Sequence, residues 1–251
     1  MNIKVVDHSA EMAVEAAKIM MEIMKTEEAP VLGLATGGTP ETTYRELVKA
    51  ANEGQVSFKN TTTFNLDEYV GLPASDQNSY RYYMEDRLFN HVDIDRENTH
   101  IPDGMAEDID AEIKAYEEKI KNAGGIDLQL LGIGTNGHIG FNEPGTPFNT
   151  RTHVIALDES TREANARYFA SIDEVPTHAI TMGIESILEA KKILLLISGA
   201  KKGQALAEVL YGTIREDVPA TALRNHPDVT MIVDQEAYAA AKVPGEEDVH
   251  A

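Results

Sequence analysis

Apolar residues in this chain form short continuous runs separated by longer stretches with helical spacing. Residues 3–6 form the first short run and predict a strand, and residues 9–25 predict a helix with Ser9 as its N-cap. The expected apolar face of this helix consists of Met12, Ala16, Ile19 and Ile23. The chain is therefore expected to begin with a strand followed by a helix.

The same order of strand, loop and helix recurs along the rest of the chain. Residues 30–35 predict a second strand, residues 36–40 a turn, and residues 41–52 a helix. The other expected strands are residues 61–66, 126–133, 193–198 and 229–233, with a weaker one at residues 154–157.

Some expected strands are apolar on both faces, as in the segments LQLLGIG and KILLLIS. Such strands are typical of parallel sheets that carry helices on both sides. We therefore predict an α/β fold, a single-domain, three-layer, Rossmann-like doubly wound sheet that is mostly parallel. No repeat or linker interrupts residues 1–251, and the last residues, VPGEEDVHA, are expected to be a disordered acidic tail. In such folds ligands bind beyond the carboxyl ends of the strands.

The chain is strongly acidic, with 22 basic and 42 acidic residues and a formal net charge of -20. This charge repels polyanions and argues against a nucleic-acid partner, because nucleic-acid binding depends on basic groups that release counterions. A small anionic substrate is compatible with this charge only where a few basic side chains and backbone N–H groups are concentrated.

The chain has no cysteine, which excludes a disulfide framework, a thiol nucleophile and a thiolate metal site. No apolar run approaches the roughly 20 residues of a membrane-spanning helix. The first residues, MNIKVVDHSAEM, lack the pattern of an export signal. We expect a cytoplasmic protein with no membrane partner.

A glycine-rich turn, Thr36-Gly37-Gly38-Thr39-Pro40, follows the second expected strand. Two glycines allow the backbone to approach an anion, two hydroxyls flank it, and Pro40 would lie near the first position of the next helix. The turn resembles a phosphate-binding loop, although it has neither a P-loop nor a dinucleotide-binding motif. The alternative is a tight strand-to-helix turn that simply requires glycine.

Two adjacent carboxylates, Asp67 and Glu68, follow the third expected strand in the segment FNLDEY. Adjacent residues of an extended chain point to opposite faces, so at most one of them should enter a given pocket. A general base is the functional interpretation. A carboxylate that caps the next segment is the structural alternative.

The densest group of candidate residues is GIGTNGHIGFNEP, residues 132–144, after the strand at 126–133. His138 titrates near neutral pH, and Glu143 is placed to hold one ring tautomer and to raise the imidazole pKa. A lone histidine more often makes a structural hydrogen bond. Its position on a strand-end loop, flanked by Asn136 and Glu143, favours a functional role here.

Two basic residues lie where a phosphate group could be bound. Arg167 falls in a predicted helix, and Lys202 follows the strand at 193–198. Either residue taken alone is compatible with a solvated surface position.

Taken together, these segments closely resemble the glucosamine-6-phosphate deaminase family. TGGTP, FNLDEY, GIGTNGHIGFNEPG, AITMGI and SGAKK occur in the order and spacing of that family, so the resemblance covers nearly the whole chain. GHIGFNEPG is the specific part, whereas TGGTP alone would indicate the wider superfamily of sugar-phosphate lactonases and isomerases.

The resemblance implies roles for individual residues. Asp67 would move a proton from C2 to C1 of the open-chain sugar, His138 would open the pyranose ring, and Glu143 would orient and charge His138. The expected phosphate ligands are Thr36, Gly37, Gly38, Thr39, Arg167 and Lys202. The resemblance also implies that the reaction needs no metal or organic cofactor. The small-molecule substrate that it implies is glucosamine 6-phosphate.

Two departures from the family pattern affect these expectations. Some members have aspartate where this chain has Asn136, so the histidine pKa is expected to be lower here. Members activated by N-acetylglucosamine 6-phosphate have basic residues at the positions of His153 and Ile155, and a longer C-terminal segment. We therefore expect no such activation, and a monomer or small homo-oligomer instead of an allosteric hexamer.

Three other functions are compatible with parts of this pattern. A 6-phosphogluconolactonase would share the phosphate loop but hydrolyse an ester, and ammonia release separates the two reactions. A non-catalytic sugar-phosphate sensor is disfavoured because Asp67, His138 and Glu143 occur together and no DNA-binding segment is evident. An acidic scaffold protein is disfavoured by the glycine-rich strand ends.

Overall fold

The centre of the computed structural model is a seven-stranded sheet in the order β1-β10-β9-β6-β2-β3-β5. All neighbouring strands of this sheet run parallel, as the sequence predicts. The structure describes residues 1–241, except the side chains of Ser160 and Ala164, and the predicted acidic tail lies outside the described residues. The strands are β1 (Asn2–Val6), β2 (Val31–Leu34), β3 (Thr62–Asn65), β5 (Thr99–His100), β6 (Leu128–Leu131), β9 (Lys192–Ile197) and β10 (Val229–Asp234).

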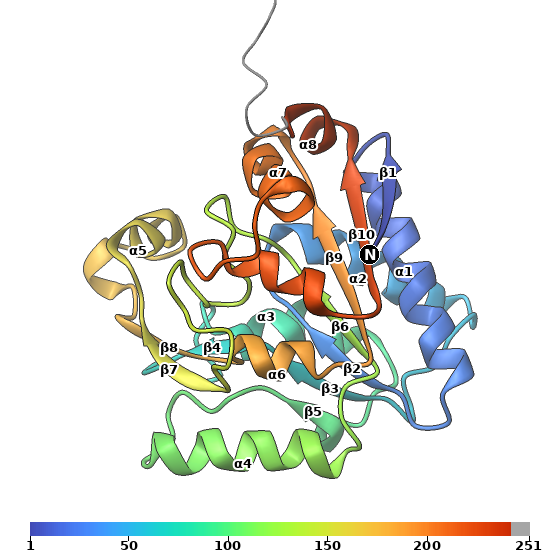
Figure 1. Ribbon diagram of the computed structural model, residues 1–251. Helices are drawn as coiled ribbons and strands as arrows, with labels where there is room; N and C mark the ends of the chain where they lie inside the picture. Colours follow the sequence, from blue (N-terminus) through green and yellow to red (C-terminus); the bar gives the residue numbers. More distant parts are fainter. Residues whose placement is uncertain (242–251) are drawn as a thin grey trace, which may run out of the picture.

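Helices cover both faces of this sheet (Figure 1). One hydrophobic cluster packs α1 (Ser9–Thr26), α2 (Gly38–Asn52) and α3 (Tyr80–Arg87) against one face. A second cluster packs four helices against the other face, namely α4 (Ile109–Asn122), α6 (Ile184–Leu188), α7 (Gly203–Tyr211) and α8 (Gln235–Ala240). The predicted three-layer, doubly wound architecture is therefore confirmed.

A second, smaller sheet is antiparallel and has the strand order β4-β8-β7. The weaker strand expected at 154–157 belongs to it as β7 (His153–Ala156). The sequence pattern predicted neither β4 (Asp67–Tyr69), which is only three residues long and begins with two carboxylates, nor β8 (His178–Thr181). Figure 1 shows α5 (Glu159–Asn165) beside this small sheet, away from the parallel one.

Two helices begin differently from the prediction. His8, not Ser9, caps α1, because its imidazole accepts a hydrogen bond from the N–H group of Glu11. Helix α2 begins at Gly38 instead of Glu41, with Gly37 as its N-cap at φ 112°. The glycine-rich turn is thus itself the first turn of α2, which brings the free N–H groups of the helix to this loop.

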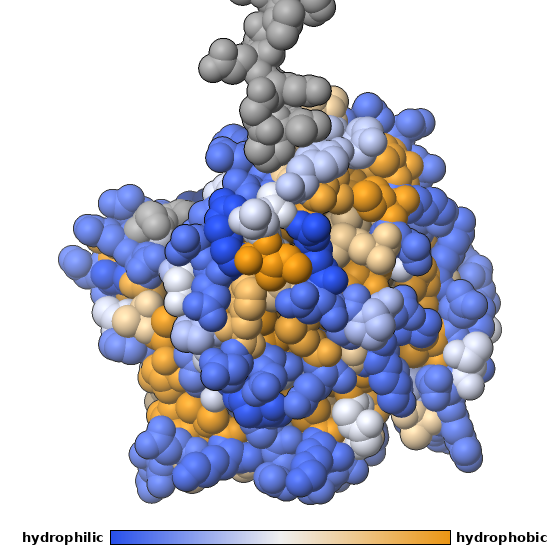
Figure 2. Space-filling model, in the orientation of Figure 1, coloured by the Kyte–Doolittle hydropathy of each residue, from blue (hydrophilic) through white to orange (hydrophobic). Residues whose placement is uncertain are grey.

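The surface contains both hydrophilic and apolar side chains. On the face seen in Figure 2, hydrophilic side chains are spread over the whole surface and apolar groups lie between them in patches. Within residues 1–241, no helix has both the length and the apolar character required to cross a membrane.

Candidate active site

The predicted site segments follow four strands that are neighbours in the sheet, in the order β9-β6-β2-β3. From β2 the chain continues to β3 and β5 on one side, whereas β6, β9 and β10 lie on the other side. The strand order therefore reverses between β2 and β6, and ligands bind beyond the carboxyl ends of the strands at such a point. Thr36, Asp67, His138 and Lys202 follow the ends of these four strands and therefore lie at this end of the sheet.

The two adjacent carboxylates after β3 have different surroundings. The Glu68 carboxylate accepts hydrogen bonds of 2.9 Å from the backbone N–H groups of Tyr69, Tyr80 and Arg81. It thereby caps the first turn of α3, which is the structural alternative considered for this pair. Asp67 is left to face the loop of His138, where its Oδ2 atom would lie 3.9 Å from a Cβ atom built on Gly140.

Burial makes Asp67 an unusually basic carboxylate. Its side chain is 7% exposed, and burial together with the nearby charge of Glu68 raises its pKa to about 8. A carboxylate with this pKa binds a proton far more strongly than an exposed aspartate does. Asp67 therefore has the basicity required to remove a proton from carbon.

Asn136 connects the imidazole of His138 to the carboxylate of Glu143. Its Nδ2 atom donates to Oε2 of Glu143 at 2.9 Å, and its Oδ1 atom accepts from the backbone N–H of His138 at 3.2 Å. The same Oδ1 atom lies 2.7 Å from Nδ1 of His138, so Nδ1 must carry the ring proton. The Nε2 atom of the neutral ring is then free to accept a proton.

The glycines of this loop leave room for the ring. A Cβ atom on Gly134 would lie 2.1 Å from the imidazole, and Gly137 has φ 85°. His138 therefore occupies the space that a side chain at position 134 would fill.

The pKa of His138 lies below its ordinary value, mainly because burial disfavours the charged ring. Glu143 acts in the opposite direction, and Lys202 lowers the pKa further. From the sequence we expected Glu143 to charge the ring. Its effect has that direction, because a nearby carboxylate favours the protonated imidazole, but Oε2 lies 3.7 Å from Nδ1 and the effect of burial is larger.

Thr181 joins the Asp67 strand to the His138 loop. It is the direct partner of Asp67 in the antiparallel pair β4–β8, and its hydroxyl accepts a hydrogen bond from the N–H group of Phe141 at 3.1 Å. Asn142 adds a second link, because its Nδ2 atom donates to the carbonyl group of Met182 at 2.8 Å. Thr181 was not predicted as a site residue, although the motif AITMGI around it was the available signal.

The predicted phosphate-binding residues are only partly brought together. Gly37 and Gly38 are exposed at the N-terminus of α2, where a Cβ atom on either would meet nothing within 4 Å, and the hydroxyl of Tyr83 holds the loop by donating to the Gly37 carbonyl at 2.6 Å. Thr36 and Thr39 flank them and are half-buried. The loop thus presents backbone N–H groups to solvent.

The two predicted cations lie in different surroundings. Lys202 is beside the His138 loop, where its ammonium donates to the Ile133 carbonyl at 2.6 Å and burial lowers its pKa. The exposed guanidinium of Arg167 lies 4.7 Å from the ring centre of Tyr168 and donates to the hydroxyl of that residue. No contact described in residues 1–241 joins Arg167 to the glycine-rich loop.

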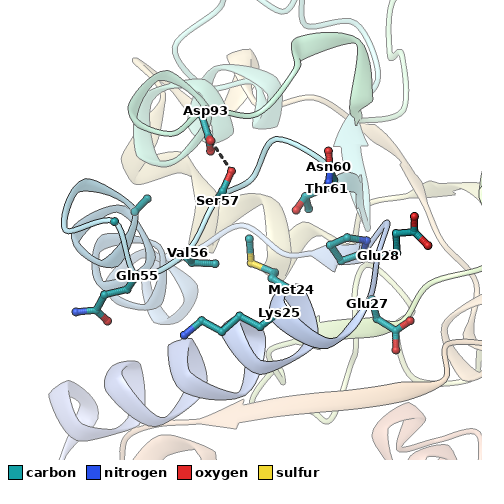
Figure 3. A pocket seen from close by; sticks show the side chains of 13 residues that line it. Met24, Lys25, Glu27, Glu28, Gln55, Val56, Ser57, Asn60, Thr61 and Asp93 are labelled. Atoms are coloured by element: carbon teal, nitrogen blue, oxygen red, sulfur yellow. Dashed lines mark hydrogen bonds between the residues drawn. The ribbon is translucent and has the colours of Figure 1, made fainter.

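A cavity of about 510 Å³ lies at the opposite end of the sheet (Figure 3). Pro30 and Thr61, which precede β2 and β3, line it together with Glu27 and Glu28 after α1. None of the candidate residues lies there, so this cavity is separate from the candidate active site.

A model of the glucosamine-6-phosphate isomerase and 6-phosphogluconolactonase family matches residues 5–232. The chain belongs to this family.

Similar family members are deaminases. A glucosamine-6-phosphate deaminase of Shouchella clausii is 57% identical over 237 residues, 94% of this chain and 96% of the relative. Glucosamine-6-phosphate deaminase 1 of Bacillus subtilis is 55% identical over 222 residues, 88% of this chain and 92% of the relative.

Solved structures of the family share the fold. A monomeric glucosamine-6-phosphate deaminase superposes with a TM-score of 0.93 at 52% identity, covering 96% of this chain and all of that one. A 6-phosphogluconolactonase of Thermotoga maritima gives a TM-score of 0.74 at 21% identity, covering 93% and 99%. The likeness to the lactonase concerns the fold alone.

Proposed function

We propose that this chain is a single-domain deaminase that converts glucosamine 6-phosphate to fructose 6-phosphate and ammonia. The observation that carries the proposal is the pairing of a basic, buried Asp67 on strand β4 with a neutral His138 on a loop that Thr181 joins to this strand. A carboxylate and an imidazole so placed are able to divide the proton transfers of an aldose-to-ketose conversion.

His138 opens the sugar ring. Its free Nε2 atom accepts the proton of the anomeric hydroxyl and returns it to the ring oxygen as the C1–O5 bond breaks, which yields the open-chain aldehyde. Asn136 fixes the tautomer that this step needs, and Glu143 stabilises the imidazolium while it carries the proton.

Asp67 moves the proton between the two carbons. It takes the proton from C2 while the ammonium group of the substrate gives one proton to O1, which leaves a neutral enolamine. It then delivers its proton to C1, which leaves a cationic iminium group at C2. Water adds to this carbon, one of its protons passes to the nitrogen, which leaves as ammonia, and its other proton is released to solvent as the C2 carbonyl forms. Atoms and electrons balance without an oxidant, and we expect no metal or organic cofactor.

The phosphate group is bound at the start of α2. The exposed N–H groups at Gly37 and Gly38 and the hydroxyls of Thr36 and Thr39 supply neutral donors, and Lys202 supplies charge. Arg167 joins them only after its guanidinium leaves the ring of Tyr168. Such a cluster concentrates positive potential in a chain whose net charge is -20.

We also propose a quaternary structure and a location for this protein. The structurally similar deaminase is monomeric. We expect a monomer or a small oligomer that acts in the cytoplasm and lacks activation by N-acetylglucosamine 6-phosphate.

The decisive experiment measures ammonia and fructose 6-phosphate together, from glucosamine 6-phosphate with chelator present. The wild-type protein should release both products in equal amounts, and Asp67→Asn should abolish them. A protein that releases no ammonia but hydrolyses 6-phosphogluconolactone would be a lactonase, and the proposed deamination would be wrong.

A further inference from the structure

Helix α5 carries two polar side chains one turn apart on the same face, Thr161 and Asn165. The Thr161 hydroxyl donates to Oε1 of Glu143 at 3.1 Å. The Asn165 amide donates to the hydroxyl of Tyr69 at 3.0 Å. One face of this short helix is therefore bound to residues on both catalytic segments.

The two contacts join α5 to the two segments that carry the proposed proton-transfer residues, which are the His138 loop and the strand that begins with Asp67. Glu143 belongs to the loop of His138, and Tyr69 ends the strand that begins with Asp67. Phe169, just beyond the 3-10 turn η3 (Ala166–Tyr168), packs against the Tyr69 ring at a centroid distance of 6.0 Å. The segment from α5 to Phe169 thus lies over the loop and the strand.

Thr161 completes the hydrogen bonding of a carboxylate that is nearly inaccessible to water. The residue Glu143 is 7% exposed, its Oε2 atom is bound to Asn136, and its Oε1 atom is bound to Thr161. With a donor on each oxygen, the plane of the carboxylate is fixed beside the imidazole. Without Thr161, Oε1 loses a partner in a place where bulk water is a poor substitute.

We propose that Thr161 is a positioning residue for the deamination reaction. Its hydrogen bond to Glu143 links the position of α5 to the carboxylate that supports His138. The inference rests on the proposed function and adds to it a route by which a segment outside the catalytic loops acts on the imidazole. Arg167 lies in η3, directly after α5. A phosphate that draws in Arg167 would hold the same segment in place, so binding and proton transfer would be linked.

The test compares Thr161→Val, which keeps the side-chain shape but removes the hydroxyl, with Thr161→Ser, which keeps the hydroxyl. In the full chain we expect Thr161→Val to lower kcat by about tenfold, as for the loss of a hydrogen bond to a charged group. The NMR titration midpoint of His138, assigned with His138→Gln, should fall, because a loosened Glu143 no longer opposes burial and Lys202. Thr161→Ser should restore both quantities.

Two further variants separate this role from a general loosening of the helix. Glu163→Gln changes an exposed residue of the same helix and should alter neither quantity. In a Glu143→Gln background, Thr161→Val should cause no further loss of kcat, because the group through which it acts is already neutral.

The outcomes distinguish this inference from the proposed function. An active wild type whose kcat and His138 titration are unchanged by Thr161→Val would overturn the positioning role and leave the deaminase intact. Full additivity of Thr161→Val with Glu143→Gln would also overturn it. A wild type without ammonia release would instead refute the proposed function itself.

Discussion

Asp67 and Thr181 face each other across the antiparallel pair β4–β8, and Thr181 also binds the backbone of the His138 loop through Phe141. The relative position of the proposed base and the proposed ring-opening histidine therefore depends on a threonine that need not touch the substrate.

Thr181→Val should lower kcat while affecting KM less. The variant retains the volume of the side chain but leaves the N–H group of Phe141 without its acceptor, which costs about 1–3 kcal/mol. Part of this cost should appear as a roughly tenfold lower kcat, because the His138 loop is less firmly held. Steady-state kinetics and urea unfolding measure the two effects, and Thr181→Ser is the matched control. Equal kinetics for Thr181→Val and wild type would refute this link.

Asp67→Asn should abolish activity and increase the free energy of unfolding. Between pH 4 and pH 8 the folded protein keeps a proton on Asp67 that the unfolded chain has lost, so wild-type stability falls as pH rises through this window. The variant lacks this penalty and should be more stable than wild type by about 2–4 kcal/mol at pH 9, and by less at pH 5. Urea unfolding at both pH values measures the difference.

Glu68→Gln provides the contrast for that experiment. In the wild type, the Glu68 carboxylate accepts hydrogen bonds from the N–H groups of Tyr80 and Arg81 at the start of α3 and from that of Tyr69 in β4, whereas an amide offers only one acceptor oxygen. We expect this variant to be less stable than wild type by about 1–3 kcal/mol. If both variants shift stability in the same direction, the different surroundings assigned to the two carboxylates would be wrong.

The pH dependence of kcat/KM should report the ionisation of Asp67. The free enzyme is competent to remove the C2 proton only when this carboxylate is ionised, so kcat/KM should rise with pH and level off above about 8. Initial rates between pH 5.5 and 9.5 measure the profile. A kcat/KM that stays constant from pH 5.5 to 9.5 would exclude Asp67 as a base with a raised pKa.

Asn136→Asp should raise the pKa of His138. The substitution places a carboxylate oxygen where the amide oxygen lies 2.7 Å from Nδ1, and a nearby negative charge favours the protonated ring. We expect the NMR titration midpoint of His138 to rise by about one pH unit. Asn136→Ala, which removes the hydrogen bond without adding charge, should leave the tautomer unfixed and reduce kcat about 10-fold to 100-fold. An unchanged midpoint in Asn136→Asp would contradict the assigned contact.

The parallel sheet could be predicted from the sequence because its strands are buried on both faces. LQLLGIG and KILLLIS have apolar residues at successive positions, and this pattern depends little on the rest of the chain. The positions of Asp67 and His138 followed from the rule that ligands bind at the carboxyl ends of such strands. Their hydrogen-bond partners could not be predicted in the same way.

The unpredicted features depend on contacts between distant segments. Strand β4 is a strand because it pairs with β8, and no local pattern in Asp-Glu-Tyr indicates this. The pKa of His138 is lowered by burial, which a list of neighbouring residues in the sequence does not give. Thr161 similarly reaches Glu143 only because α5 folds back over the loop.

Asn136 also limits where protons travel. A carboxylate in its place would be able to take up the proton of the imidazole and pass it on, whereas an amide exchanges protons with its neighbours very slowly. In the proposed mechanism, the proton that His138 removes from the sugar therefore does not pass to Glu143, and it returns to the sugar or goes to water. The amide therefore restricts proton transfer to the Nε2 atom of His138, so that the ring exchanges protons with the substrate or water and not with Glu143.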